Sequence, residues 1–392
     1  MTNHFSTQAV QAGNDMPAPQ GHPVSPSIYP AVTYTYDNMD DLSAALHENA
    51  GYSYSRYASP TIAMLEKAVA ALEGTEDAVA YASGMGALHG ALAQANITPD
   101  RPVVAARNMY GATYALLNKM YADSGAVRFV EITDRDVVQA AIEQYCPRAI
   151  VLETISNPLL KIPDIPAVTR WAHDHDAIVI VDNTFATPYL YRPIVHGVDV
   201  VVHSATKYLG GHGDVLAGVV ATNAVRANEL RMQSRYHGAI LGSFEAWLTL
   251  RGLRTLALRL REQCANALKI AEWLTDHRSI ARVIYPGLPD HPDHALAQQL
   301  FRANHFGGIV SFELRQAAEP EVFRFMERLK LIQAATSLGD VYSLLLYPAQ
   351  SSHHALGREE RLRQGIGDGL VRLSVGIEDA EDIIADLDQA LR

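Results

Sequence analysis

Short apolar runs that alternate with helical patterns are the feature that most constrains the fold of this chain. The runs are rich in Val, Ile and Ala, and they cover Ala78–Ala82, Val103–Ala106, Val127–Glu131, Ala149–Glu153, Ile178–Val181 and Val200–Val202. Strands that alternate with helices in this way form a mainly parallel sheet with helices on both faces. The sequence therefore predicts an α/β fold.

A helix is predicted from Pro60 to Gly74. Ser59 supplies a helix cap, and Pro60 suits the first turn. Ile62, Leu65, Val69 and Leu72 then recur at helical spacing, and Gly74 ends the segment.

Three regions are expected along the chain. The stretch Pro17–Pro60 is rich in Pro, Tyr and Ser, so residues 1–58 are predicted to form an extended arm. Residues 59–250 form the large domain. A long helical region, Phe244–Leu274, leads into a smaller C-terminal α/β domain, residues 251–392, with strand-like runs at Gly308–Leu314 and Leu370–Val375.

Composition sets the remaining limits. The chain has 392 residues, 48% of them hydrophobic, which is ample for buried cores. Its net charge of −11 opposes binding to nucleic acid. The N-terminus lacks the pattern of a secretory signal, and no apolar run approaches the roughly 20 residues that span a bilayer. We therefore expect a cytoplasmic protein without a membrane partner, in which Cys146 and Cys264 are reduced thiols in ordinary packing.

Two reactive side chains follow neighbouring strands of the predicted sheet. Asp182 comes directly after Ile178–Val181, and Lys207 follows Val200–Val202 and precedes a glycine-rich turn. Ligands of open α/β sheets bind at the carboxyl ends of the strands, where these residues should meet. Pyridoxal 5'-phosphate (PLP) matches both: its aldehyde condenses with a lysine, and its ring nitrogen stays protonated beside a carboxylate.

The phosphate of such a cofactor also has candidate donors. Ser83, Gly84 and Met85 lie between a strand and a small-residue helix, an arrangement in which free N–H groups and the helix dipole bind anions. Ser204 and Thr206, just before Lys207, offer hydroxyl groups. Taken alone, the glycine turn is more often only a tight connection between a strand and a helix.

Several separated motifs, in order, resemble the trans-sulfuration (Cys/Met metabolism) family of fold-type-I PLP-dependent enzymes. They are Tyr54-Ser55-Arg56, Ser83-Gly84-Met85, Asp182-Asn183-Thr184, the segment from His203 to Asp214 and the segment from Gly369 to Gly376. The likeness runs from about Val24 to the C-terminus. It implies the fold-type-I architecture, a mainly parallel central sheet plus a smaller C-terminal α/β domain, and PLP as cofactor.

The resemblance also implies roles for single residues. Lys207 is then the Schiff-base lysine and proton shuttle, and Asp182 the partner of the ring nitrogen. Tyr110 stacks on the cofactor and serves the leaving group, Asn157 lies near the cofactor's ring oxygen, and Ser337 and Arg372 bind the substrate carboxylate. Tyr54 and Arg56 reach the cofactor phosphate of a neighbouring subunit, so a homotetramer built from two dimers with shared sites is expected.

Several of these residues also have a purely structural interpretation. Tyr110 could be a half-buried structural tyrosine, Arg372 a member of a structural ion pair, and the segment Tyr54–Arg56 a surface loop. The histidine pairs at 173/175, 291/294 and 353/354 have no convincing third ligand, so no metal site is predicted. His212 is expected to shape the turn after Lys207.

The substrate is less constrained. Methionine γ-lyases usually have a cysteine where this chain has Ala112, and a Lys-Asp pair in a segment that here reads Gln233–His237. Enzymes of cystathionine often have acidic residues where this chain has Ser53 and Thr336.

These features favour a carbon–sulfur γ-lyase acting on L-methionine, homocysteine or cystathionine. The alternative is a γ-replacement synthase or sulfhydrylase that uses O-acetyl- or O-succinylhomoserine. A non-catalytic scaffold is disfavoured because Lys207, Asp182 and Arg372 are all present.

Overall fold

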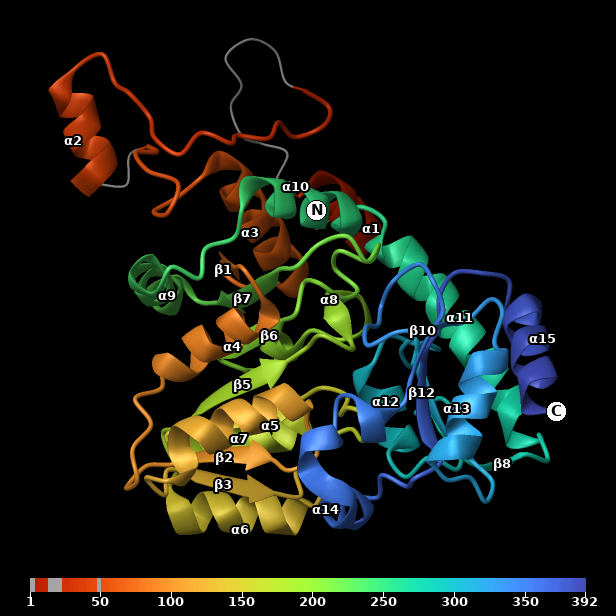
Figure 1. The fold of residues 1–392 in the computed structure, drawn as a ribbon. Coiled ribbons are helices and arrows are strands. Elements are labelled where there is room, and N and C mark those ends of the chain that lie inside the picture. Colours follow the sequence, from red (N-terminus) through yellow and green to blue (C-terminus); the bar gives the residue numbers. More distant parts are fainter. Residues whose placement is uncertain (1–3, 13–22, 48–50) are drawn as a thin grey trace.

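The computed structural model describes residues 4–12, 23–47 and 51–392. Two sheets organise these residues, and the long helix α11 (Leu256–Thr275) runs from the large lobe into the small one (Figure 1).

The large lobe is built on a seven-stranded sheet in the order β1-β7-β6-β5-β4-β2-β3. Only β7 is antiparallel to its neighbours, β1 and β6; the other pairs are parallel. The strands are almost entirely buried, which explains their continuous apolar runs. Their bounds are β1 (Asp77–Tyr81), β2 (Val103–Ala106), β3 (Val127–Val130), β4 (Ala149–Glu153), β5 (Ile178–Asp182), β6 (Val200–His203) and β7 (Gly218–Thr222).

Helices cover this sheet in two layers. α4 contacts α5 and α9, and α6 contacts α7. Right-handed crossovers between parallel strands place α5 and α6 on opposite faces, because β3 lies to one side of β2 and β4 to the other. The helices of this lobe are α3 (Pro60–Glu73), α4 (Gly84–Ala93), α5 (Gly111–Leu117), η1 (Asn118–Ala122), α6 (Arg135–Tyr145), α7 (Ile165–Asp174), α8 (Thr187–Leu190), η2 (Pro193–His196) and α9 (Ala224–His237).

The predicted helix after Ser59 is α3, and Gly74 ends it in the left-handed conformation with φ 84°. The hydroxyl of Ser59 does not cap the helix as expected. It lies 3.1 Å from the hydroxyl of Ser243, and so it ties the start of α3 to α10 (Ser243–Leu253).

The small lobe has a five-stranded sheet in the order β10-β11-β12-β9-β8. Its two predicted strands, β9 and β12, are adjacent and antiparallel. The predicted helical region Phe244–Leu274 is two helices, because the chain leaves helical geometry at Thr255. The elements are β8 (Ile280–Ile284), β9 (Ile309–Leu314), β10 (Gln333–Ala334), β11 (Leu344–Leu346), β12 (Leu370–Ser374), α12 (His294–Leu300), α13 (Glu319–Arg328), η3 (Pro348–Gln350), η4 (His354–Leu356), α14 (Gly357–Arg363) and α15 (Ala380–Leu391).

The N-terminal region is less extended than predicted. It contains α1 (Phe5–Gln11), which packs against α3 and α11, and α2 (Met39–His47), which projects away from the body (Figure 1). Residues 1–3, 13–22 and 48–50 of the predicted arm lie outside the described residues. The division at 58 and 250 stays a prediction; the second boundary falls inside α10.

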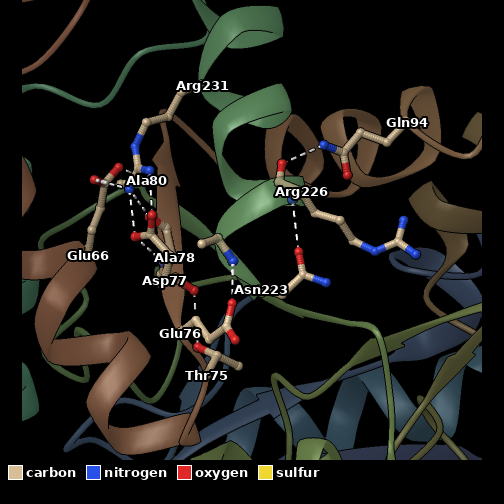
Figure 2. Close-up of polar contacts among 11 residues, drawn as sticks. Glu66, Thr75, Glu76, Asp77, Ala78, Ala80, Gln94, Asn223, Arg226 and Arg231 are labelled. Carbon is tan, nitrogen blue, oxygen red and sulfur yellow. Dashed lines mark hydrogen bonds and ion pairs between the residues drawn. The ribbon is translucent and has the colours of Figure 1, made fainter. Parts of the chain in front are cut away.

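Arg231 fastens helix α9 to the edge of the large sheet (Figure 2). Its guanidinium donates to both carboxylate oxygens of Asp77 at 2.5 and 2.7 Å, to Glu66 at 3.2 Å and to the carbonyl oxygen of Ala78 at 2.8 Å. Glu66 also accepts from the N–H of Ala80 at 2.8 Å. One cation thus joins α9, α3 and β1.

Candidate active site

A cavity of about 460 Å³ opens at the carboxyl ends of β4, β5 and β6, where the small lobe meets the large sheet. It is lined by Ser83, Gly84, Met85, Leu88, Tyr110, Thr113, Glu153, Ile155, Asn157, Asp182, Thr184, Phe185, Ser204, Thr206, Lys207, Leu216, Thr336, Leu338, Leu346, Ser351, Ser352 and Arg372. Ten of the thirteen residues that the sequence singled out are among them; Ser337, Tyr54 and Arg56 are not.

Lys207 follows β6 and points its amine toward the small lobe. Nζ donates to the hydroxyl of Ser337 at 3.1 Å, which places Ser337 beside the cavity although it does not line it. Burial and the nearby Arg372 lower the pKa of Lys207, while Asp340 opposes the shift. These surroundings therefore shift Lys207 toward the neutral amine, the form that can act as a nucleophile or a base.

Asp182 ends β5, beside Glu153 at the end of β4. The two residues are paired in register on adjacent parallel strands. One carboxylate oxygen of Asp182 accepts from the N–H of Thr184 at 2.9 Å. Burial raises the pKa of Asp182, against hydrogen bonds from Thr184 and the field of His203. No Lys or Arg of the described residues forms an ion pair with it, so a cationic ligand group would be strongly favoured here.

Glu153 was not predicted as a site residue. Its two oxygens accept from the N–H groups of Tyr110 at 2.6 Å and Asn157 at 3.0 Å. Burial and the neighbouring Asp182 raise the pKa of Glu153 to about 8. The carboxyl group thus holds two cavity-lining segments in place. Its position at the end of a strand, next to Asp182, was the available sequence signal.

The predicted anion site has the expected geometry. Ser83 caps α4, and its hydroxyl accepts from the N–H of Gly86 at 3.1 Å. The N–H groups of Gly84 and Met85 belong to the first turn, which has no intrahelical acceptors. Ser204 packs against Gly84, where a Cβ atom would come within 2.7 Å of the serine Cβ. The hydroxyl of Thr206 instead donates to the carbonyl oxygen of Ala217 at 3.1 Å, so its hydrogen is already engaged.

Arg372 on β12 is buried, with 2% of its surface exposed. It donates to the side-chain oxygen of Asn157 at 2.8 Å and to the carbonyl oxygen of Ser337 at 3.1 Å, and its Nε atom is buried without a partner. Burial lowers the pKa of Arg372 to about 10. Among the described residues no carboxylate forms a salt bridge with it, which argues against the alternative of a structural ion pair and for an external anion.

Tyr110 immediately precedes α5 and leaves 41% of its surface exposed to the cavity side. Tyr54 is similarly exposed, and the guanidinium of Arg56 donates to the carbonyl oxygen of Arg235 at 2.8 Å. Arg56 also packs on the rings of Tyr54 and Tyr57. This segment therefore lies outside the cavity of its own chain.

Other candidate groups have local partners. His212 shares a hydrogen bond of 2.8 Å with the carbonyl oxygen of Gly210, within the turn it was expected to shape. Over the part of the chain that the structure describes, no three His, Cys, Asp or Glu side chains are grouped as metal ligands, and no helix is both long and apolar enough to cross a membrane. Cys146 is exposed and Cys264 is buried, and both are free.

Comparison with known proteins gives a consistent result. The profile of the family described as Cys/Met metabolism PLP-dependent enzyme matches residues 6–392. The chain belongs to this family.

Several known relatives are similar to this protein over nearly the whole chain. The L-methionine gamma-lyase of Pseudomonas deceptionensis is 41% identical over 393 residues, which covers 99% of this chain and 97% of the relative. The cystathionine beta-lyase of Lactococcus lactis subsp. cremoris is 42% identical, with 94% of each chain covered.

A solved structure shows the same fold. Cystathionine gamma synthase from Xanthomonas oryzae pv. oryzae, in complex with aminoacrylate and cysteine, superposes with a TM-score of 0.93 at 38% identity and covers 100% of this chain and 98% of its own. The predicted fold-type-I class and PLP as cofactor are therefore confirmed, and the protein is a carbon–sulfur lyase or replacement enzyme of sulfur amino-acid metabolism.

The residues of this family member fit PLP on their own geometry. The cavity places the amine of Lys207, whose pKa is lowered, the carboxylate of Asp182, which has no cationic partner among the described residues, and the open first turn of α4 around one space. Lys207 would hold the aldehyde carbon, Asp182 the ring nitrogen, and Gly84, Met85 and Ser204 the phosphate. Arg372 would remain for a second anion, such as the carboxylate of an amino acid.

Proposed function

We propose that the protein is a PLP-dependent carbon–sulfur γ-lyase of sulfur amino acids. It would convert L-methionine, homocysteine or cystathionine to a 2-oxo acid, ammonia and a thiol.

The charge distribution of the cavity carries this proposal. Of the described residues that line it, the ones with acidic or basic side chains of Asp, Glu, Lys or Arg are Glu153, Asp182, Lys207 and Arg372. The cofactor and the α-carboxylate engage Lys207, Asp182 and Arg372, and Glu153 is occupied by backbone N–H groups. The remaining wall is apolar or carries hydroxyl groups, for example Leu216, Leu338 and Thr113. Such a wall suits a short side chain without charge, such as that of methionine or homocysteine.

Each of the cavity residues has a separate role in the proposed reaction. Bound PLP withdraws electrons from the substrate, which makes hydrogens on Cα and Cβ removable and allows a γ-substituent to leave. Arg372 binds the α-carboxylate by paired N–H groups and so fixes the amino acid in one orientation. The neutral amine of Lys207 takes the Cα proton, and Ser337 at 3.1 Å holds that amine in place. Asp182 keeps the ring nitrogen protonated, and the hydroxyl of Tyr110 donates a proton to the departing sulfur.

A γ-replacement synthase or sulfhydrylase is the second candidate. The TM-score of 0.93 with a cystathionine gamma synthase favours it, since the same residues could present the substrate to an incoming thiol instead. The two reactions share every step that precedes departure of the γ-substituent.

Product analysis separates these candidates. The cofactor-loaded protein is incubated with L-methionine, homocysteine, cystathionine, O-acetylhomoserine and O-succinylhomoserine, each with and without added thiol. Release of 2-oxobutanoate and thiol from the sulfur amino acids without an acceptor is the expected result. A thioether that forms only with added thiol would favour replacement, and pyruvate from cystathionine would indicate β-elimination. The Lys207→Ala variant is the control for non-enzymatic decay.

We also infer that the cytoplasmic enzyme is a homotetramer of two dimers that share active sites. The phosphate cradle of Gly84, Met85 and Ser204 contains no basic side chain, and the two basic residues that line the described cavity, Lys207 and Arg372, have other roles in the proposed reaction. Arg56 does not line the cavity of its own chain and donates to the carbonyl oxygen of Arg235 instead. An arginine from a neighbouring subunit would supply the missing charge.

A further inference from the structure

Two residues of one turn, Ser352 and His353, approach the cavity from the small lobe and have no part in the chemistry described above. Ser352 lines the cavity, as Tyr110 does. His353 lies behind it and is 1% exposed. The hydroxyl oxygen of Ser352 and Nδ1 of His353 are 2.8 Å apart.

His353 holds the hydroxyl group of Ser352 in place through this hydrogen bond. Burial and the field of Arg372 lower the pKa of His353 to about 4, so the ring is neutral and has one donor and one acceptor nitrogen. Hydrogen bonds with the backbone of Met109 and Asn157 oppose this shift. Whether the serine hydroxyl donates to Nδ1 or accepts from it, its oxygen keeps at least one lone pair that His353 does not use.

The oxygen of Ser352 can therefore accept a hydrogen bond from a group in the cavity. The turn that carries it packs tightly on the backbone next to Tyr110, because a Cβ atom at Gly111 would collide with the carbonyl oxygen of Ser352. Arg372 anchors the substrate at its carboxylate, and Tyr110 serves the leaving group. In the proposed binding mode, Ser352 lies beside the position of the γ-substituent.

We propose that Ser352 is a specificity-determining residue, whose oxygen is positioned by His353 and favours γ-substituents that donate a hydrogen bond to it. The free thiol of homocysteine would then be preferred over the S-methyl group of methionine, which cannot donate and leaves the oxygen unpaired. His353 acts as a positioning residue. This inference rests on the proposed γ-elimination.

The test uses L-homoserine and L-norvaline, which differ only by a hydroxyl or a methyl group at the γ position. Their binding to the cofactor-loaded enzyme is measured by the change in cofactor absorbance, and kcat/KM is measured for homocysteine and methionine. The wild-type protein is expected to prefer homoserine. Ser352→Ala reduces this preference by about threefold to tenfold, the usual effect of one neutral hydrogen bond, while Ser352→Thr retains it. His353→Leu changes the preference in the same direction as Ser352→Ala.

The proposal would be overturned if Ser352→Ala changed the affinity for homoserine and norvaline equally, or changed neither. A residue that only packs the turn would affect the binding of both ligands to the same extent. The binding comparison does not depend on turnover. A wild-type protein that releases no 2-oxobutanoate from any donor would count against the γ-lyase proposal, and the homoserine-to-norvaline ratio would still decide the role of Ser352.

Discussion

The buried carboxyl group of Glu153 couples the stability of the site to pH. In protein without cofactor, burial and Asp182 raise its pKa from 4.5 to about 8. The unfolded chain releases this proton near the ordinary value, so between these two pH values the folded state binds more protons. The contribution of Glu153 to the free energy of unfolding is therefore present at low pH and is lost as the pH rises through about 8.

We expect Glu153→Gln to remove this contribution, because the amide fills the same space and stays neutral. Urea unfolding of the cofactor-free protein at the two ends of that pH window measures the effect. The variant should lose less stability than the wild type toward high pH. Parallel pH profiles for the two proteins would show that Glu153 is already ionised in the folded state.

Gly84 is required by close approach rather than by backbone conformation. A Cβ atom there would lie 2.7 Å from Cβ and 2.9 Å from Cα of Ser204, so the first turn of α4 would have to move away from the phosphate position. Gly84→Ala is expected to raise the dissociation constant of PLP by at least about tenfold, equivalent to about 1.4 kcal/mol. Gly86→Ala is the matched control, since its Cβ would meet only ordinary contacts, the nearest at 3.4 Å. Titration of PLP by absorbance measures both, and equal constants would contradict the role of Gly84.

The expectation that ligands bind at the carboxyl ends of the strands located part of the site from the sequence. The site residues that this expectation missed were missed for physical reasons. Asp182 and Lys207 follow apolar strands and do reach one cavity. Glu153 obeys the same rule and was missed because it was treated as part of the strand. Ser352 and His353 lie in an irregular turn of the small lobe, where no periodic pattern links position in the sequence to position in space.

Helix α9 depends on the charge cluster in Figure 2. Arg231 is largely buried and pairs with Glu66 and Asp77, so its removal leaves two carboxylates without their cation. Arg231→Met is expected to lower the free energy of unfolding by about 2 to 4 kcal/mol, somewhat less than for a fully buried pair. Arg226→Met on the same helix is the control. Arg226 pairs with Asp199 at 3.5 Å, and its loss should cost about 1 kcal/mol or less. Chemical unfolding of both variants checks the difference.

Helices and strands were predicted best where a single hydrophobic pattern, either helical or strand-like, covered the whole segment. The helix α3 and the buried strands β2 and β4 have the predicted extents, apart from single residues at their ends. Strand β7 (Gly218–Thr222) was missed, although it is buried between β1 and β6. Helix α2 was taken for extended chain because the surrounding Pro, Tyr and Ser residues outweighed its short helical segment. The order of strands in the sheet follows from long-range pairing, which local patterns do not contain.

The assembled enzyme should need two chains for each working site. Arg56→Ala is expected to weaken PLP binding by about 10-fold to 100-fold, because charged hydrogen bonds to a phosphate contribute roughly 1.5 to 3 kcal/mol. Lys207→Ala removes the reactive amine. Each variant alone is therefore expected to have little activity at limiting cofactor.

Mixing the two variants decides whether the site is shared. In a mixed dimer, the Arg56→Ala chain contributes an intact Lys207, and the Lys207→Ala chain contributes an intact Arg56. If Arg56 crosses to the neighbouring cofactor, one site of that dimer is complete, and activity at limiting PLP returns after the variants are unfolded and refolded together. If Arg56 serves its own chain, no combination holds both residues, and the mixture stays as inactive as its components. Arg56→Lys mixed with Lys207→Ala tests the geometry of the contact, because a lysine keeps the charge but loses the paired N–H groups.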